Sequence, residues 1–235
     1  MPESSTLALV GYGQMGRLIE ELAPAAGFDI VLKLDEFNNE DGVGMTAEAF
    51  DGVDVAIDFS IPDVVADNAV RLCELGVNTV IGTTGWLGQI DRVTAAVDSS
   101  GIGLVHGANF SVGVNAFYDI VEAGARAMAA AEDYDAWAWE AHHKMKLDAP
   151  SGTMLRLIDA MKAAGYNRPV DVAATRVGYV PGTHEIGFDS EADSIQLRHT
   201  ARSRVGFARG ALRAARWVIG KKGLFEFSKI WRETL

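Results

Sequence analysis

Short apolar runs alternate with amphipathic stretches through the first half of the chain. Runs rich in Val, Ile and Leu predict buried strands, and a helical apolar period between them predicts helices. The predicted strands are Leu7–Val10, Phe28–Leu34, Val53–Phe59, Val77–Ile81 and Ile102–Val105. Helices are predicted over Arg17–Ala26 and from Pro62 to the residue before Gly76. Strands that alternate with helices favour an α/β domain whose parallel sheet is covered on both faces.

The pattern changes after about Ser111. Asn115–Ala131 is a long Ala-rich stretch that predicts a helix, and alternation in Asp135–His142 predicts a strand with Glu140 and His142 on one face. A further helix is predicted at 152–164, strands at 170–177, 184–188 and 194–199, and a last helix at 207–220. This second part is typical of a smaller α+β domain with a mostly antiparallel sheet.

Composition and charge narrow the classes of protein. Of the 235 residues 49% are hydrophobic, enough for a sizeable core, so intrinsic disorder is excluded. The net charge of −11 opposes binding to nucleic acid and to anionic membranes, but a locally basic pocket could still take a small anionic ligand. No apolar run approaches the ~18 residues that span a bilayer. Met1–Ser5 lacks the basic segment of a secretory signal, so we expect a cytoplasmic protein. The single cysteine, Cys73, lies in an apolar stretch and is interpreted as a buried structural thiol.

A glycine motif, Gly11-x-Gly13-x-x-Gly16, lies between a predicted strand and a predicted helix, and Asp35 ends the next strand. Such glycines let the backbone approach a pyrophosphate, and the helix start offers N–H groups to it. The carboxylate accepts hydrogen bonds from ribose hydroxyls. A tight turn that holds no ligand is the alternative. The strand–turn–helix context favours a dinucleotide.

The residues around Asp35 bear on the choice of cofactor. The four that follow it, 36–39, provide no cation for the 2′-phosphate of NADPH and add a further acidic group. A like-charge pair at 4 Å costs about 4 kcal/mol at an effective dielectric constant of 20. NADH is therefore favoured, and NADPH stays possible because Lys33 lies two residues before Asp35.

Two glycine-containing loops, 82–85 and 107–110, each follow a predicted strand. The carboxyl ends of parallel strands line the ligand crevice of open α/β sheets, so both loops are candidates for cofactor contacts. Ordinary connections between strand and helix are an equal alternative.

The densest chemical segment is Glu140–Thr153, with the sequence EAHHKMKLDAPSGT. Its two histidines and two lysines form a basic spot in an acidic protein. Such a spot suits an anionic substrate and a proton donor whose unperturbed pKa, about 6.5, lies near working pH. No cysteine and no H-E-x-x-H spacing supports zinc, so we expect no metal, and structural histidines stay an alternative. After Pro150 a helix start and the Thr153 hydroxyl could hold a carboxylate.

At these residues the chain resembles the bacterial dihydrodipicolinate reductase (4-hydroxy-tetrahydrodipicolinate reductase) family of lysine and diaminopimelate biosynthesis. The similarity rests on Glu140–Thr153, which matches the pattern E-x-H-H-x-x-K-x-D-A-P-S-G-T, and on Gly82–Gly85, Ala108–Asn115 and Phe207–Trp217. The glycine motif is one residue shorter than the GxxGxxG of many members. The tail Gly223–Lys229 differs from the usual Gly-Leu-Tyr-x-Met-x-Asp.

The resemblance implies a Rossmann-like dinucleotide-binding domain, 1–110 with 205–235, and a substrate-binding and oligomerisation domain, 111–204, in a homotetramer. It implies a cyclic unsaturated dicarboxylate as substrate, with hydride transfer from the nicotinamide to ring C4. His142 would supply the proton at C3, and Lys146 would stabilise the charge that develops between these events. The substrate's carboxylates would be bound by His143, Gly152 and Thr153. Cofactor contacts are implied at Gly11, Tyr12, Gly13, Gln14, Met15, Asp35, Gly82, Thr83, Thr84, Gly107, Ala108, Asn109 and Phe110.

Two other functions stay open. A related NAD(P)-dependent amino-acid or imine dehydrogenase would keep the glycine motif without needing His-His-x-x-Lys. A catalytically silent nucleotide-binding sensor would need neither His142 nor Lys146. An NADH-oxidation assay separates these alternatives.

Overall fold

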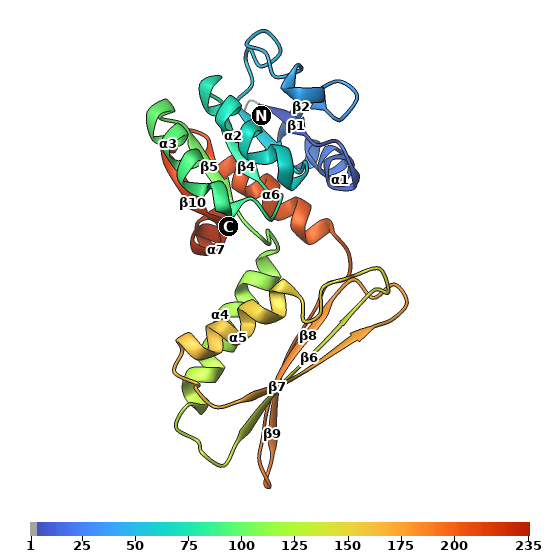
Figure 1. Ribbon diagram of the computed structural model, residues 1–235, viewed down its shortest axis with the longest axis vertical. Helices are drawn as coiled ribbons and strands as arrows, with labels where there is room; N and C mark the ends of the chain where they lie inside the picture. The colour runs from blue at the N-terminus through green and yellow to red at the C-terminus, as the bar shows by residue number, and fades with distance from the viewer. Residues whose placement is uncertain (1–3) are drawn as a thin grey trace. The chain divides into compact units, whose positions relative to one another are not determined.

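The structure is a computed structural model that describes residues 4–235. The chain divides into two compact units (Figure 1). The first unit comprises the chain up to Val112 together with Val205–Leu235, and the second comprises Gly113–Arg204. The expectation that no secretory signal begins the chain rests partly on residues 1–3, which lie outside the described residues.

A six-stranded parallel sheet forms the centre of the first unit, in the order β10-β5-β4-β3-β1-β2. Helices α2 and α3 pack together on one face, and α1 and α6 pack together on the other (Figure 1). Because both faces are covered, the central strands are continuous apolar runs. The strands are β1 (Ser5–Val10), β2 (Phe28–Leu34), β3 (Val55–Asp58), β4 (Asn78–Ile81), β5 (Gly103–His106) and β10 (Gly223–Glu226). The helices are α1 (Gln14–Leu22), α2 (Pro62–Glu74), α3 (Ile90–Ser100) and α6 (Val205–Val218).

Strand β1 pairs with both β2 and β3, and the helices that follow β1 and β3 lie on opposite faces. This is the topological switch point of a doubly wound sheet, where ligands of such folds bind. Five short helical segments complete the first unit: η1 (Pro24–Ala26), η2 (Glu40–Gly42), η3 (Leu87–Gln89), α7 (Phe227–Ile230) and η4 (Trp231–Thr234).

The parallel sheet and its five predicted strands are confirmed, whereas α3 and the edge strand β10 were not predicted. The prediction that the first helix reaches Ala26 is wrong, because α1 ends at Leu22. Pro24 cannot donate the backbone hydrogen bond that would continue the helix, so η1 forms instead and Gly27 closes it at φ 75°.

The second unit is a mixed sheet with two helices on one face (Figure 1). Its strand order is β7-β6-β8-β9, with β6–β8 and β8–β9 antiparallel and β6–β7 parallel, so a mostly antiparallel sheet is confirmed. The elements are α4 (Val112–Met128), β6 (Asp135–His142), α5 (Gly152–Ala163), β7 (Val170–Arg176), β8 (Thr183–Asp189) and β9 (Ser194–Thr200).

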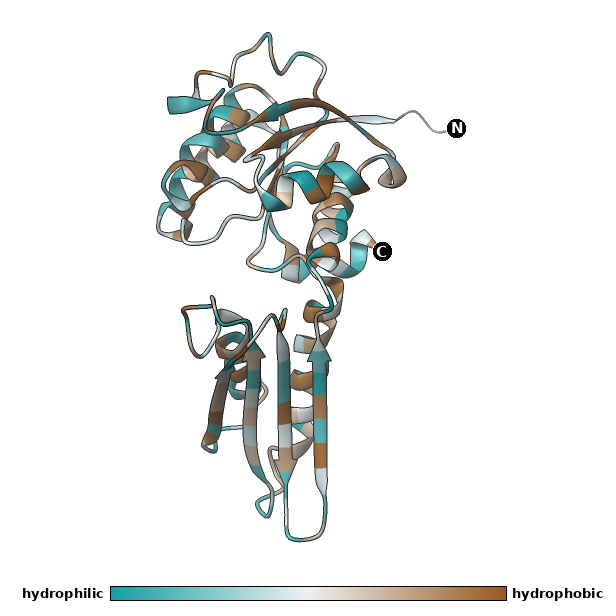
Figure 2. Cartoon of the chain, turned by 90° about the vertical axis from the view of Figure 1, so that its right-hand side faces the viewer, coloured by the Kyte–Doolittle hydropathy of each residue, from teal (hydrophilic) through white to brown (hydrophobic). Residues whose placement is uncertain are grey.

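Alternation along β6 decides which side chains face the helices. Ala136 and Ala138 belong to the core under α4 and α5, and Glu140 and His142 continue the same alternate positions toward the end of the strand. Figure 2 shows apolar and polar residues alternating along these strands. The sheet therefore carries a carboxylate and an imidazole on its buried face, where polar groups need partners.

Cys73 is buried in α2, as predicted, and burial raises the pKa of its thiol, which fits a structural residue. None of the helices in residues 4–235 has the length and apolarity needed to cross a bilayer.

Candidate functional site

The residues predicted to hold a cofactor gather at one edge of the parallel sheet. The glycine turn follows β1, Asp35 follows β2, residues 82–84 follow β4 and residues 107–110 follow β5. Because these strands run in the same direction, the four loops share the carboxyl edge, which is where open α/β sheets bind ligands.

Each glycine of the turn has its own structural reason. Gly11 has a φ of +85°, and a Cβ there would lie 2.5 Å from the backbone of Phe59 and Ser60, so only glycine fits. A Cβ on Gly16 would lie 2.8 Å from the Gly11 carbonyl oxygen, so α1 packs directly on the turn. A Cβ on Gly13 would meet nothing within 4 Å. The turn thus leaves an open cradle at the start of α1, which fits a pyrophosphate.

The Asp35 carboxylate is held at the end of β2 by an Asx turn. Its Oδ1 accepts hydrogen bonds from the backbone N–H groups of Phe37 at 2.9 Å and Asn38 at 3.3 Å. The Asp35 N–H in turn donates to the Asn38 side chain at 2.8 Å. A carboxylate oriented in this way could accept hydrogen bonds from ribose hydroxyls.

Lys33, the cation nearest in sequence to Asp35, is already paired. Its Nζ donates to the Glu20 carboxylate at 3.0 Å and lies 5.1 Å from the centre of the Tyr12 ring. The Tyr12 hydroxyl donates to the same carboxylate. Hydrogen bonds from Tyr12 and Lys33 lower the pKa of Glu20, so its negative charge persists at neutral pH beside the Lys33 ammonium.

The loop after β3 supports its neighbours, and sequence analysis missed it. A Cβ on Gly82 would lie 2.1 Å from the Phe59 ring, and the Phe110 ring contacts Phe59 edge to face at 6.4 Å between centres. The Thr83 hydroxyl donates to the Ser60 carbonyl at 3.1 Å. The signal that could have found this loop is that β3 also ends at the carboxyl edge.

Asp58, the last residue of β3, is a buried carboxyl beneath this edge. It accepts hydrogen bonds from the Ser60 N–H at 2.7 Å and the Asn68 side chain at 3.0 Å. Burial raises the pKa of Asp58 to about 6, because these bonds offset only part of the desolvation.

The second unit gathers five side chains at one end of its sheet, which we call the carboxylate–histidine cluster. Glu140 and His142 end β6, Arg176 ends β7 opposite His142, and His184 lies on β8 opposite Glu140. Ser151 immediately precedes α5 and caps it. The cluster comprises Glu140, His142, Ser151, Arg176 and His184.

Glu140 is the anion of the cluster and is fully buried. It accepts hydrogen bonds from Arg176 Nη2 at 2.6 Å, from the Ser151 N–H at 3.0 Å and from the Ser151 hydroxyl. Burial alone would raise the pKa of Glu140, but these donors outweigh it and hold the pKa below its usual value. The carboxylate therefore stays ionised inside the protein.

His142, the predicted proton donor, lies beside this carboxylate. Its Nδ1 is buried without a hydrogen-bond partner, 3.9 Å from Glu140 Oε2. Burial lowers the pKa of His142, and the Glu140 charge opposes that effect. The His184 ring lies edge to face at 5.0 Å, and burial together with the His142 charge lowers the pKa of His184 to about 4. His184 is therefore uncharged at neutral pH.

Lys146 and the start of α5, both predicted to act on the substrate, are brought together by Asp148. Its carboxylate pairs with Lys146 Nζ at 2.7 Å and accepts a hydrogen bond from the Gly152 N–H. The Thr153 hydroxyl hydrogen-bonds the Tyr118 phenol of α4. The Asp148 carboxylate thus shows that one carboxylate can contact both the Lys146 ammonium and an N–H group at the start of α5.

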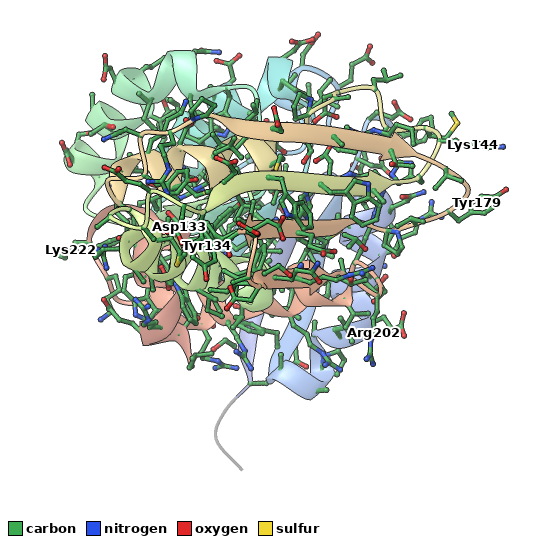
Figure 3. The ribbon with its side chains drawn as sticks, turned by 90° about the horizontal axis from the view of Figure 1, so that it is seen from below. Asp133, Tyr134, Lys144, Tyr179, Arg202 and Lys222 are labelled. Atoms are coloured by element: carbon green, nitrogen blue, oxygen red, sulfur yellow. The ribbon has the colours of Figure 1, made fainter. Side chains whose placement is uncertain are left out.

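The two residues after His142 differ in their surroundings. His143 is half-buried, and its carbonyl accepts the Lys146 N–H in a turn. Lys144 is exposed and lies next to Tyr179, with Nζ 5.9 Å from the ring centre (Figure 3). The Lys144 ammonium is thus directed to a surface contact rather than into the cluster.

Ligand atoms of Glu140, His142 and His184 lie within 4.8 Å of one another, a grouping that could be taken for a metal site. Arg176 and Ser151 already occupy the Glu140 carboxylate, however. We therefore interpret the cluster as a network of charges and hydrogen bonds.

Sequence analysis assigned no role to Glu140, Ser151, Arg176 or His184. One signal was available for His184, because it alternates with Ile186 and Phe188, both of which belong to the core. A histidine in register with two core residues is buried and needs a polar partner. Nothing in the local pattern pointed to Arg176, which reaches Glu140 across 36 positions of sequence.

The doubly wound sheet with its glycine turn, joined to a unit that carries buried acid–base side chains, defines a dinucleotide-dependent oxidoreductase with two units. The family model described as the N-terminus of dihydrodipicolinate reductase matches residues 5–110, and that of the C-terminus matches residues 113–231. The chain belongs to the dihydrodipicolinate reductase family, whose members use NAD(P)H as reductant.

Two curated relatives match over nearly their whole length. The 4-hydroxy-tetrahydrodipicolinate reductase of Christiangramia forsetii is 36% identical, covering 95% of this chain and 96% of the relative. That of Chromobacterium violaceum is 35% identical, covering 97% and 98%.

Solved structures show that the fold is shared more widely. Dihydrodipicolinate reductase from Paenisporosarcina sp. TG-14, with dipicolinate bound, superposes with a TM-score of 0.79 at 21% identity, covering 97% of this chain and 99% of that one. An amine dehydrogenase from Mycobacterium smegmatis has a TM-score of 0.56 at 13% identity, covering 95% of each chain. The fold alone therefore does not specify the substrate.

Proposed function

We propose that this protein reduces 4-hydroxy-tetrahydrodipicolinate, by way of dihydrodipicolinate, to tetrahydrodipicolinate in lysine and diaminopimelate biosynthesis. The observation that carries the proposal is the match of both units to one reductase family, with His142 and Lys146 in its second unit. The amino-acid or imine dehydrogenase and the silent sensor are not favoured, because neither accounts for the match of the second unit.

The first unit is the proposed cofactor domain. Residues 11–15 bind the pyrophosphate, Asp35 binds the ribose of the adenosine half, and the loops 82–84 and 107–110 line the rest of the cofactor. When bound, the cofactor supplies the hydride that the substrate receives at ring C4. The support is the open space over Gly13 and the fixed carboxylate of Asp35.

The second unit is the proposed substrate domain. His143, Gly152 and Thr153 bind the substrate's carboxylates, His142 donates a proton to C3, and Lys146 stabilises the negative charge that builds before that proton arrives. One hydride and one proton together reduce one carbon–carbon double bond. Asp148 supports this assignment, because its carboxylate already occupies Lys146 and the α5 start and would leave both when a substrate carboxylate binds.

The preference for NADH over NADPH rests on charge. Asp35 would repel a 2′-phosphate, and the Lys33 ammonium that could offset it is paired with Glu20. In wild type we expect a higher kcat/KM for NADH, and in Asp35→Ala a ratio that moves toward NADPH. A wild-type preference for NADPH of tenfold or more would contradict this. Glu20→Gln, which releases Lys33, should also move the ratio toward NADPH.

A small anionic dicarboxylate is the proposed partner, with neither nucleic acid nor membrane involved. A homotetramer in the cytoplasm completes the proposal, and sedimentation velocity on the purified protein tests the tetramer.

The direct assay follows NADH absorbance with freshly generated 4-hydroxy-tetrahydrodipicolinate. We expect oxidation that depends on this compound and a product with two more hydrogens than dihydrodipicolinate. Oxidation with amino-acid-derived imines instead would point to the dehydrogenase alternative. NADH binding without turnover of either compound would point to the sensor.

A further inference from the structure

The Glu140 carboxylate has more donors around it than a structural ion pair with Arg176 requires. Oε1 takes the Arg176 guanidinium at 2.6 Å and the Ser151 N–H at 3.0 Å. Oε2 takes the Ser151 hydroxyl and is also the carboxylate oxygen that faces both imidazoles, His184 Nε2 at 3.6 Å and His142 Nδ1 at 3.9 Å. The carboxylate is thus fixed in place with one oxygen directed at the histidines.

The Ser151 hydroxyl settles which form of His184 is present. A hydroxyl has one proton, and Ser151 donates it to ionised Glu140, which cannot donate in return. Ser151 Oγ also accepts the Met154 N–H at 3.2 Å as the cap of α5, and it lies 3.1 Å from His184 Nε2. His184 must therefore donate from Nε2. Because burial lowers the pKa of His184 to about 4, the ring is neutral at neutral pH. His184 is thus a further hydrogen-bond partner of the Ser151 hydroxyl, and it places no second positive charge beside Glu140.

His142 is the member of the cluster that lacks a partner. Its side chain is 8% exposed, and its Nδ1 is one of few buried side-chain polar atoms in the described chain without a hydrogen bond. The oxygen facing it, Glu140 Oε2, lies 3.9 Å away, within about 1 Å of hydrogen-bond distance. Both side chains project from the same face of β6 two residues apart, and Nδ1 is the His142 nitrogen that forms the contact with Glu140.

We propose that Glu140 is a positioning residue for His142: its Oε2 accepts the Nδ1–H of His142, which leaves Nε2 as the nitrogen that donates the proton to the substrate. The inference rests on the proposed function, in which His142 is that donor. The carboxylate then acts twice, by fixing the tautomer and ring orientation and by stabilising the imidazolium from which the proton leaves.

Gly182 keeps the room that this orientation needs. It has a φ of +150°, and a Cβ there would lie 3.2 Å from His142 Nε2 and 3.3 Å from Cδ2. With no Cβ at position 182, the space beside Nε2 and Cδ2 is free of a side chain from that residue, while the Nδ1 edge faces Glu140.

The other charges around the cluster do not replace Glu140. Arg176 and Lys146 lower the pKa of His142, and the Asp148 carboxylate raises it by less than Glu140 does. His184, and His199 on β9 beyond it, both have pKa values lowered by burial. Glu140 is the main source of stabilisation for a positive His142.

The test is the titration of His142 by side-chain 1H–15N NMR in wild type and Glu140→Gln, which needs no substrate. We expect the Nδ1–H tautomer in neutral wild type and a pKa of His142 that falls by about one to three units in Glu140→Gln. Glu185→Gln is the matched control. It removes a carboxylate from the adjacent position of β8, where Glu185 pairs with Arg198 at 3.4 Å, and should leave the His142 titration unchanged.

The pH profile of kcat gives the second readout. Its alkaline limb, where the donor loses its proton, should move to lower pH by the same amount in Glu140→Gln, with a loss of about 10- to 100-fold at pH 7.5. A His142 pKa that is equal in folded wild type and Glu140→Gln overturns the inference. If the pKa of His142 falls as expected in Glu140→Gln but wild type does not reduce the substrate, the positioning role is supported and the proposed function is overturned instead.

A conservative variant guards against misfolding. If Glu140→Gln fails to fold because Arg176 loses its anion, Glu140→Asp keeps the charge and withdraws it by one methylene. The pKa of His142 should then fall by less than a unit and the alkaline limb should move with it, whereas an unchanged titration in folded Glu140→Asp contradicts the proposal.

Discussion

The cofactor edge of the first unit and the carboxylate–histidine cluster of the second are built in different ways. The edge is mostly backbone: glycines that allow close approach, a helix start, and one carboxylate fixed by an Asx turn. The cluster is mostly side chain, with charged and polar groups contributed by β6, β7, β8 and the start of α5. A site made of backbone tolerates few substitutions that add side-chain atoms. A site made of buried polar and charged side chains responds most strongly to substitutions that change a charge.

The largest effect should come from the proposed acid–base groups. His142→Gln and Lys146→Ala should each lower kcat by about 10²-fold or more, the usual scale for positioned acid–base catalysis. kcat/KM should fall by a similar factor, because these groups act mainly in the transition state. Steady-state kinetics measures both values, and NADH titrated by fluorescence should bind to both variants as to wild type. Near-normal turnover of His142→Gln would contradict the assignment.

The glycine turn allows a matched pair of substitutions in the first unit. Gly13→Ala adds a methyl group to open space, so the fold should persist while the cradle for phosphate narrows. The loss of a hydrogen bond to a charged group, about 1.5–3 kcal/mol, corresponds to about 10- to 150-fold in Kd.

Gly11→Ala is the partner of that test. Its φ of +85° and the backbone 2.5 Å away should destabilise the fold itself by about 1–3 kcal/mol or more. Thermal unfolding and NADH titration measure the two effects. Equal losses of stability in Gly11→Ala and Gly13→Ala would show that the turn is structural only.

A smaller effect is expected where one hydroxyl holds a substrate carboxylate. Thr153→Val keeps the shape of the side chain and removes one donor, so KM should rise by about tenfold or more while kcat changes little. Tyr118→Phe is the control, because it removes the hydroxyl that Thr153 contacts and keeps Thr153 itself. A loss confined to kcat would place Thr153 in the chemistry rather than in binding.

A further effect concerns the pH dependence of stability in the first unit, rather than activity or binding. The pKa of Asp58 is raised from 3.8 to about 6, so ionisation disfavours the folded state. Its contribution is fully present below about pH 4 and is lost as pH rises through 6, by about 3 kcal/mol at most. Asp58→Asn removes this dependence. Its stability relative to wild type should therefore rise between pH 4 and 6 and stay level above, as measured by denaturant unfolding.

The second unit should respond with the opposite sign. The pKa of His184 is lowered to about 4, so its contribution is fully present above pH 6.5 and is lost as pH falls toward 4. Hydrogen exchange of peptides from each unit, corrected for intrinsic rates, separates the two trends. Parallel trends in both units would contradict the assigned burial of Asp58 and His184.

The two regions also differ in how far sequence predicts them. The glycine turn is local, because Gly11–Gly16 are contiguous and flanked by a strand and a helix, so pattern and chemistry coincide. The same holds for Lys146 and Gly152, which share one segment with His142. The cluster draws Arg176 and His184 from strands that only the sheet register places beside Glu140. The periodicity of apolar residues within one segment does not reveal which residues of different strands lie opposite one another.

The missed elements have related causes. Strand β10 has four half-buried residues and no alternation, and it is a strand because it pairs with β5 at the edge of the sheet. Helix α3 buries only Val93 and Val97, so its apolar stripe is too sparse to predict with assurance against a polar loop. Tertiary contacts, not propensity, determine both elements.

The central claim is that the two hydrogens added to the substrate come from two sources, one held by each unit. Reduction with NADH deuterated at the transferred C4 position, and separately with unlabelled NADH in deuterium oxide, tests it directly when the product is analysed by NMR. We expect one deuterium at C4 from the labelled cofactor and one at C3 from the solvent, the latter delivered by His142. Solvent deuterium at C4, or a product that takes no deuterium from the labelled NADH, would contradict it.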